Sequence, residues 1–223
     1  MALQILERLT NESPDAAVIW LHGLGADSYD FYDIVPMLEL PQSASIKFVF
    51  PNAPVMPVTL NNGYRMTAWY DIAGIGEHYP HDIDGIRSSE RQILALIGQQ
   101  QEAGIDPERI ILAGFSQGGV VALHTALRYP GQLGGVLALS SYLAAPELLA
   151  EEKQSPPGLD IMMMHGTQDE VVSIKYGRKS ASHIQEAGYE VIWKEFLMPH
   201  SVCPEQLKLI GHWIAQRLKH DKE

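Results

Sequence analysis

The chain has 223 residues, a length that suits one α/β domain, and we expect residues 1–223 to form a single domain. Hydrophobic residues make up 46% and charged residues 19% of the sequence, which excludes a disordered or fibrous chain. The formal net charge of −11 argues against binding to nucleic acid or anionic lipid, and the single cysteine, Cys203, excludes an internal disulfide.

The sequence predicts a cytoplasmic protein without stable membrane insertion. The first ten residues lack the long apolar run of a secretory signal. Residues 110–127 carry no formal charge over 18 residues, which is the length of a membrane span, but Gly114, Gln117 and His124 interrupt the stretch. A strand, a turn and a helix explain it better.

Short apolar runs bounded by glycine and proline predict the buried strands of a parallel sheet. In chain order they lie at residues 16–21, 46–50, 109–113, 135–139, 160–164 and 190–196, after an alternating outer strand at 3–9. Helical periodicity predicts helices between them at residues 82–103, 117–128, 176–187 and 204–218. Asp82 or Asp84 is expected to cap the first helix, and Gly104 to end it. This alternation predicts a doubly wound, mostly parallel α/β sheet with helices on both faces.

The pentapeptide GFSQG at residues 114–118 fits the G-x-S-x-G pattern of a nucleophile elbow. A predicted strand precedes it and a predicted helix follows, which is the context that this motif requires. The sharp turn strains the backbone of Ser116, and the flanking glycines leave space for it. We therefore expect Ser116 to be a nucleophile, and the alternative is a glycine-rich turn with an incidental serine.

A serine nucleophile of this type is followed in the chain by an acid and then by a histidine. Among the six histidines after Ser116, His200 lies in a loop between the last predicted strand and the last helix, from which it can reach the serine. Asp169 follows the strand at 160–164 and is the expected acid, with Glu170 as the fallback. The alternatives are a surface histidine and a solvated turn aspartate.

Two backbone N–H groups are expected to form an oxyanion hole. One belongs to Gln117, directly after the nucleophile, and the other to Leu24, in the HGLG turn at residues 22–25. A nucleotide-binding G-x-G-x-x-G loop does not fit, because Ser28 occupies the third glycine position. A plain glycine turn remains the alternative.

Other catalytic chemistries find less support in the sequence. No lysine has a serine three residues before it, which excludes an S-x-x-K nucleophile. His78, His81, Asp82 and Asp84 are close enough in sequence for a metal cluster, but loop and helix-capping roles explain them better. We expect neither a metal nor a cofactor.

The chain resembles the bacterial carboxylesterase and acyl-protein thioesterase branch of the α/β hydrolases. The matching pieces run in order over nearly the whole sequence: HGLG at 22–25, PNAP at 51–54, WYD at 69–71, GFSQGG at 114–119, His165-Gly166 with Asp169, and HSVC at 200–203. The resemblance implies an α/β-hydrolase fold without a large cap domain, active on carboxylic esters and in some members on thioesters of lipidated proteins or lysophospholipids. It implies Ser116 as nucleophile, Asp169 as acid, His200 as base, and Leu24 and Gln117 as oxyanion donors. Relatives occur as monomers or homodimers.

Residues 51–81 break the alternation of strands and helices, and we expect a substrate-facing excursion there. Five of its apolar residues are candidates to contact an acyl chain: Leu60, Met66, Trp69, Ile72 and Ile75. Packing of the excursion on the core explains them equally well.

The first expectation for function is a serine carboxylesterase that hydrolyses small-molecule esters with short-to-medium acyl chains through an acyl-enzyme intermediate. The alternative is an acyl-protein thioesterase or lysophospholipase that acts on S-acylated proteins or lipids. A third class, a non-catalytic binding protein, fits poorly with the complete set of Ser116, Asp169 and His200.

Overall fold

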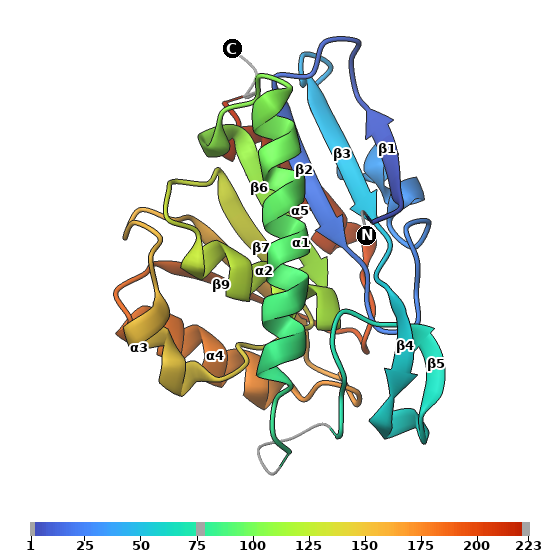
Figure 1. Ribbon diagram of the computed structural model, residues 1–223. Coiled ribbons are helices and arrows are strands. Elements are labelled where there is room, and N and C mark those ends of the chain that lie inside the picture. Colours follow the sequence, from blue (N-terminus) through green and yellow to red (C-terminus); the bar gives the residue numbers. More distant parts are fainter. Residues whose placement is uncertain (1–2, 75–78, 220–223) are drawn as a thin grey trace.

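The computed structural model describes residues 3–74 and 79–219. Its centre is a seven-stranded sheet in the order β1-β3-β2-β6-β7-β8-β9 (Figure 1). The outer strand β1 is antiparallel to β3, and every other neighbouring pair is parallel, which matches the predicted topology. The strands are β1 (Ile5–Leu9), β2 (Ala16–Leu21), β3 (Ile46–Pro51), β6 (Ile110–Phe115), β7 (Gly135–Leu139), β8 (Ile161–Gly166) and β9 (Val191–Phe196).

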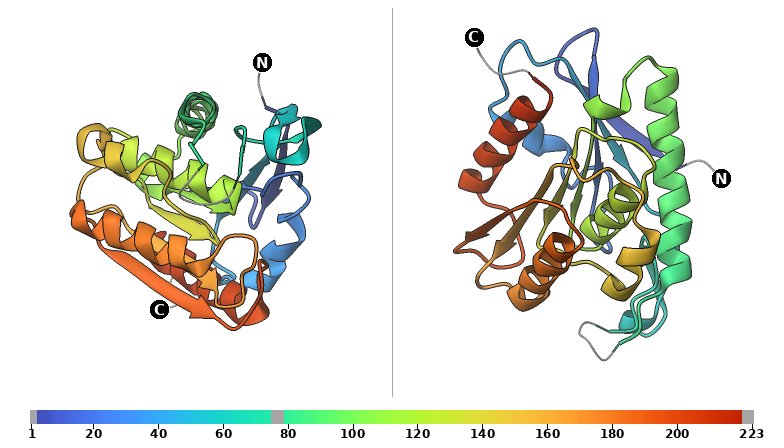
Figure 2. Two further views of the ribbon diagram at one scale, coloured as in Figure 1. Left: turned by 90° about the horizontal axis from the view of Figure 1, so that it is seen from below. Right: turned by 90° about the vertical axis from the view of Figure 1, so that its left-hand side faces the viewer.

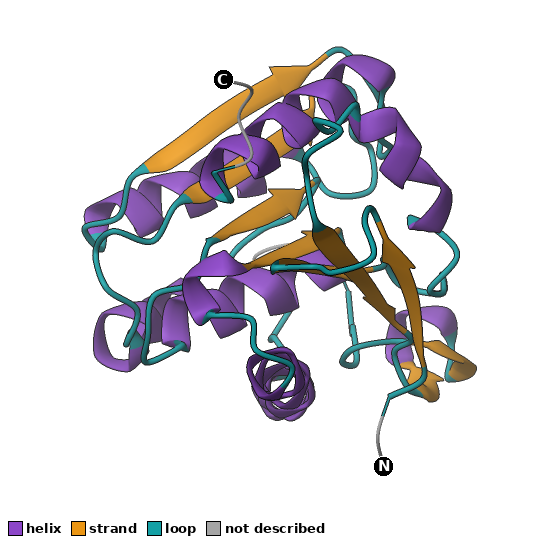
Figure 3. Cartoon of the chain, turned by 90° about the horizontal axis from the view of Figure 1, so that it is seen from above, coloured by secondary structure: helices purple, strands orange, loops and turns teal. Residues whose placement is uncertain are grey.

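Helices cover both faces of this sheet (Figures 2 and 3). Side chains of α1, α2 and α4 belong to the hydrophobic core on one face, and side chains of α5 and the 3-10 helix η1 belong to the core on the other. The helices are α1 (Ile83–Glu102), α2 (Gln117–Arg128), α3 (Leu149–Glu152), α4 (Ile174–Glu186) and α5 (Pro204–Arg217), with 3-10 helices η1 (Tyr32–Leu38), η2 (Thr59–Asn61), η3 (Pro107–Arg109) and η4 (Pro146–Leu148).

Strand β2 shows why a parallel sheet places its core on both sides. Successive side chains of a strand point to opposite faces. Accordingly Ala17, Ile19 and Leu21 pack in the first core, whereas Ala16, Val18 and Trp20 pack in the second. All six are buried, so the strand reads in sequence as an unbroken apolar run.

Helix α1 begins and ends where its sequence signals lie. The Asp82 carboxylate accepts a hydrogen bond from the Gly85 N–H at 3.0 Å, so Asp82 and not Asp84 is the cap. Gly104, with φ of 92°, adopts the left-handed conformation that lets the chain leave the helix.

The segment 51–81 contains regular structure that the sequence did not predict. Strands β4 (Val55–Val58) and β5 (Tyr64–Thr67) form an antiparallel hairpin beside the carboxyl ends of the main strands (Figure 1). Each strand has only four residues, and Pro57 lies within β4, so the alternation is too short to stand out. Proline is tolerated there because the hairpin is a separate two-stranded sheet whose strands have free edges.

Within the described residues, we find no helix that is both long and apolar enough to traverse a bilayer.

Candidate active site

Ser116 lies at a strained turn between β6 and α2. Its φ of 53° and ψ of −117° are unusual for a residue with a side chain, and helix α2 begins at the next residue. The turn is so tight that a Cβ on Gly114 would lie 2.3 Å from the Gly118 carbonyl carbon. A Cβ on Gly118 would lie 2.5 Å from the Leu21 carbonyl oxygen. The expected strand–turn–helix geometry is therefore present, and it requires both glycines.

Asp169 and His200 meet at the same edge of the sheet. His200 Nδ1 lies 2.7 Å from Asp169 Oδ2, and the aspartate side chain is 0% exposed. The other carboxylate oxygen, Oδ1, accepts hydrogen bonds from the N–H groups of Val171 at 3.0 Å and Val172 at 2.8 Å. These donors compensate the burial of the negative charge and fix the carboxylate toward the histidine.

The His200 ring packs against the residue before the nucleophile. Its centroid is 4.7 Å from that of Phe115, the last residue of β6. The structure thus places Asp169 in contact with His200, and His200 against the chain neighbour of Ser116. These residues come from the ends of β6 and β8 and the loop after β9. The fallback acid, Glu170, is exposed.

The two expected oxyanion donors belong to segments next to Ser116. Gln117 is the first residue of α2, so its N–H has no acceptor within the helix. The Leu24 N–H has no backbone acceptor among the residues that the structure describes. The turn that carries Leu24 reaches the nucleophile, because a Cβ on Gly23 would lie 3.6 Å from Ser116 Cβ.

The family model described as Phospholipase/Carboxylesterase matches residues 8–218. The chain belongs to this family. The acyl-protein thioesterase 1 of Gibberella zeae is 36% identical over 217 residues, covering 91% of this chain and 91% of that protein. The acyl-protein thioesterase 1 of Neurospora crassa is 35% identical over 217 residues, covering 91% and 87%.

Crystal structures of plant proteins are similar as well. Arabidopsis thaliana SOBER1 superposes with a TM-score of 0.86 at 30% identity, covering 91% of this chain and 99% of its own. Zea mays acyl-protein thioesterase 2 superposes with a TM-score of 0.85 at 26% identity, covering 96% and 99%. These matches confirm the α/β-hydrolase fold without a large cap domain, and the hydrolase class. Because these relatives are fungal and plant proteins, they do not support the bacterial label of the expected branch.

In this member of the family, the Gln117 side chain connects the excursion to the nucleophile turn through two hydrogen bonds. Its Oε1 accepts from the Trp69 N–H at 2.9 Å, and its Nε2 donates to the Tyr70 carbonyl at 2.7 Å. The Ser89 hydroxyl donates to the Trp69 carbonyl. No local sequence pattern predicts this link, because it joins residues that are 47 and 48 positions apart.

The apolar residues expected to contact an acyl chain differ widely in exposure among those that the structure describes. Trp69 is 2% exposed, so this side chain packs inside the protein and offers a substrate little surface. Met66 and Ile72 are half-buried, and Leu60 is 43% exposed. Ile75 lies outside the described residues.

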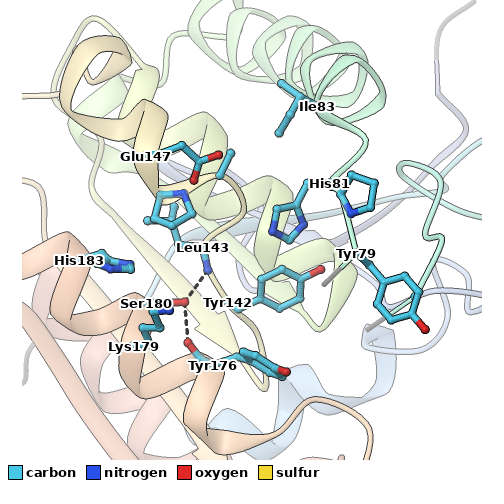
Figure 4. Close-up of a pocket in the computed structure, with 14 residues that line it drawn as sticks. Tyr79, His81, Ile83, Tyr142, Leu143, Glu147, Tyr176, Lys179, Ser180 and His183 are labelled. Carbon is cyan, nitrogen blue, oxygen red and sulfur yellow. Dashed lines mark hydrogen bonds between the residues drawn. The ribbon is translucent and has the colours of Figure 1, made fainter. Parts of the chain in front are cut away.

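A cavity of about 640 Å³ opens between the segment before α1, the loop after β7 and helix α4 (Figure 4). Aromatic and polar side chains line it together, and the centroids of His81 and Tyr142 are 5.6 Å apart. Tyr142 follows Ser141, whose hydroxyl donates to the Ser116 backbone carbonyl at 2.8 Å, but neither Ser116 nor His200 is among the lining residues. Of the described apolar candidates in the excursion, none is among the lining residues.

A second imidazole, that of His165, lies beside Asp169. The sequence motifs did not predict this contact. His165 Nε2 is 2.8 Å from the Val172 carbonyl and 3.3 Å from Asp169 Oδ2. The ring is completely buried, and burial lowers the pKa of His165 below its usual value, which favours the neutral form. Its position at the end of β8, four residues before Asp169, is the signal that points to it.

Across residues 3–74 and 79–219, no three His, Cys, Asp or Glu side chains are grouped to hold a metal ion. His78, one of the four residues weighed for such a cluster, lies outside these ranges. Asp82 instead caps α1 and accepts from the Asp71 N–H at 3.0 Å.

Proposed function

We propose that the chain is a serine hydrolase in which Ser116, His200 and Asp169 form a catalytic triad. The observation that carries the proposal is the 2.7 Å contact between His200 Nδ1 and the fully buried carboxylate of Asp169, beside the strained Ser116 turn. A carboxylate in this place holds the imidazole in one tautomer and leaves Nε2 free to accept the serine proton.

The reaction follows from these positions. Ser116 Oγ attacks the carbonyl carbon of an ester while His200 takes the hydroxyl proton. The Leu24 and Gln117 N–H groups stabilise the oxyanion of the tetrahedral intermediate. His200 then protonates the leaving alcohol or thiol. Water, deprotonated by the same imidazole, hydrolyses the acyl-enzyme and releases the carboxylic acid.

We assign carboxylic esters with short-to-medium acyl chains as the first substrate class. The cavity lined by Tyr142, which is one residue from the Ser141 contact with Ser116, has the volume of a small-molecule site, but its lining includes Glu147, His81 and His183. A long hydrocarbon chain would have to desolvate these polar groups without replacing their hydrogen bonds, which disfavours it.

Thioesters of acylated proteins are the second candidate class, and the names of the relatives favour them. Both fungal proteins at 35–36% identity are called acyl-protein thioesterase 1. The exposed side chains of Val55, Leu60 and Tyr64 on the hairpin offer apolar surface near the site for a lipidated partner. The cytoplasmic location and the monomeric or dimeric state remain predictions.

The test is hydrolysis of p-nitrophenyl esters from acetate to laurate, in parallel with an S-octanoyl and an S-palmitoyl peptide. We expect the highest kcat/KM between butyrate and octanoate, and no activity in S116A. A steady rise toward laurate together with turnover of the S-palmitoyl peptide would favour the thioesterase. Full activity in S116A would contradict the proposed nucleophile.

A further inference from the structure

The turn that carries Leu24 is held from several directions. The His22 carbonyl accepts from the Trp69 indole N–H at 2.9 Å. The Gly23 carbonyl accepts from the Ala26 N–H at 3.2 Å, and the Gly25 N–H donates to the Thr67 carbonyl at 2.8 Å. Hydrogen bonds to Trp69 and Thr67 therefore hold the turn against the excursion, while the Leu24 N–H makes no backbone hydrogen bond to the described residues and can donate to a substrate.

The His22 ring makes a shorter contact with the same turn. Its Nδ1 lies 2.7 Å from the Gly23 carbonyl oxygen, and its Nε2 lies 3.0 Å from the Ala53 backbone nitrogen. A backbone N–H only donates, so Nε2 is the acceptor and Nδ1 carries the proton. Burial lowers the pKa of His22, which favours this neutral form. The Nδ1–H therefore donates to the Gly23 carbonyl.

This hydrogen bond fixes the orientation of the next peptide. No peptide bond in the described chain is cis, and in a trans peptide the C=O and N–H groups point to opposite sides. Because the Gly23 carbonyl is held toward the imidazole, the Leu24 N–H points away from it. Gly23 itself lies against the Ser116 side chain.

We propose that His22 is a positioning residue that keeps the oxyanion hole formed by holding the Gly23–Leu24 peptide in its productive orientation. The inference rests on the proposed hydrolase function. If this peptide rotated, its carbonyl oxygen would face the developing oxyanion and repel it, and one donor would be lost. His22 is 2% exposed, so it acts through the peptide and not on the substrate.

Two substitutions of similar size separate the two contacts of the ring. His22→Asn places an amide N–H near the position of Nδ1 and retains the donor to the Gly23 carbonyl, but leaves the Ala53 N–H without an acceptor. His22→Gln places an amide oxygen near Nε2 and retains the acceptor for Ala53, but removes the Nδ1 donor. Both variants are compared with wild type on p-nitrophenyl butyrate, with the melting temperature measured in parallel.

We expect His22→Gln to lower kcat by about 10- to 100-fold with KM within about twofold, and His22→Asn to keep kcat within about threefold. The inhibition constant of an alkylboronic acid, whose tetrahedral adduct places an oxygen in the hole, should rise in step with the loss of kcat in His22→Gln. If both variants lose activity in proportion to their melting temperatures, or if His22→Gln is fully active, the positioning role is overturned. A wild-type protein that does not hydrolyse the ester overturns the proposed function, and the inference with it.

A measurement on the wild-type protein applies even if a variant does not fold. Long-range ¹H–¹⁵N NMR of the histidine rings at pH 7.5 reports which nitrogen carries the proton. We expect His22 in the Nδ1–H form. The Nε2–H form would overturn the proposal, because the ring would then have no proton to donate to the Gly23 carbonyl.

Discussion

Asp169 Oδ2 lies 2.7 Å from His200 Nδ1 and 3.3 Å from His165 Nε2. One buried carboxylate oxygen thus faces two imidazoles, and the other accepts two backbone N–H groups. The proposed mechanism needs only His200, so the geometry makes separate predictions for the acid and for the second histidine.

Asp169→Asn is expected to lower kcat by about 10³- to 10⁴-fold with little change in fold. The amide no longer accepts from His200 Nδ1 in the same way, and the imidazole is free to take the wrong tautomer. Glu170→Gln is the matched control, because Glu170 is the adjacent acid but is exposed. Steady-state kinetics on p-nitrophenyl butyrate check both variants. Loss of activity in Glu170→Gln with retention in Asp169→Asn would reverse the assignment of the acid.

The buried histidines are expected to make the protein less stable as the pH falls below about 7. Burial lowers the pKa of His22 and His165 from the usual 6.5, so the unfolded chain binds more protons than the folded protein in this range. The contribution of these two histidines to stability is therefore fully present above pH 6.5 and is lost as the pH falls through their lowered pKa values. Asp30, whose pKa burial raises, acts in the opposite sense nearer its own range.

Urea unfolding at pH 7.5, 6.5 and 5.5 tests this dependence. The midpoint should fall with pH in wild type and fall less in His165→Gln, which cannot be protonated. His183→Gln is the control, because it makes the same replacement at a half-buried position on α4 instead of a fully buried one. An equal slope in all three proteins would show that His165 is not buried in its neutral form.

The hydrogen bond from Gln117 Nε2 to the Tyr70 carbonyl is expected to stabilise the fold. Replacing Gln117 by glutamate, which has nearly the same shape, tests this contribution. Gln117→Glu retains an acceptor for the Trp69 N–H but leaves the buried Tyr70 carbonyl without its donor. The free energy of unfolding should fall by about 1–3 kcal/mol. Gln168→Glu is the control, since Gln168 is exposed. Urea unfolding at pH 7.5 measures the difference, and equal midpoints would contradict the contact.

Replacing a glycine of the nucleophile turn by alanine is expected to abolish activity, whereas the same replacement within helix α1 is expected to stabilise the protein. Gly118→Ala places a Cβ 2.5 Å from the Leu21 carbonyl oxygen, so the turn must open and activity should be lost. Gly98→Ala lies in α1, where a Cβ meets nothing within 4 Å, and should stabilise the protein by about 0.5–1 kcal/mol. Ester hydrolysis and thermal unfolding check the pair, and an active Gly118→Ala enzyme would contradict the close approach.

Local sequence was enough to predict the main sheet and the approximate positions of the four longer helices. Buried parallel strands read as apolar runs, and Asp82 and Gly104 mark the ends of α1 by capping chemistry that acts within a few residues. The GFSQG turn was predictable for the same reason, because its strain and its glycines are properties of five consecutive residues.

The parts that could not be predicted depend on contacts between distant segments. The β4–β5 hairpin has strands of four residues and contains Pro57, so its alternating pattern is too short to be recognised in the sequence. The inward position of Trp69 follows from hydrogen bonds to His22 and Gln117. His165 could be placed at a strand end, but its approach to the Asp169 carboxylate appears only once the turn at 166–172 has folded back.

Reaction with a fluorophosphonate probe, followed by peptide mapping, tests the central claim most directly. The account predicts a single adduct on Ser116 in wild type, formed at least about 100-fold more slowly in His200→Ala, because the base that activates the serine is missing. No adduct, an adduct on another residue, or an unchanged rate in His200→Ala would contradict the triad of Ser116, His200 and Asp169.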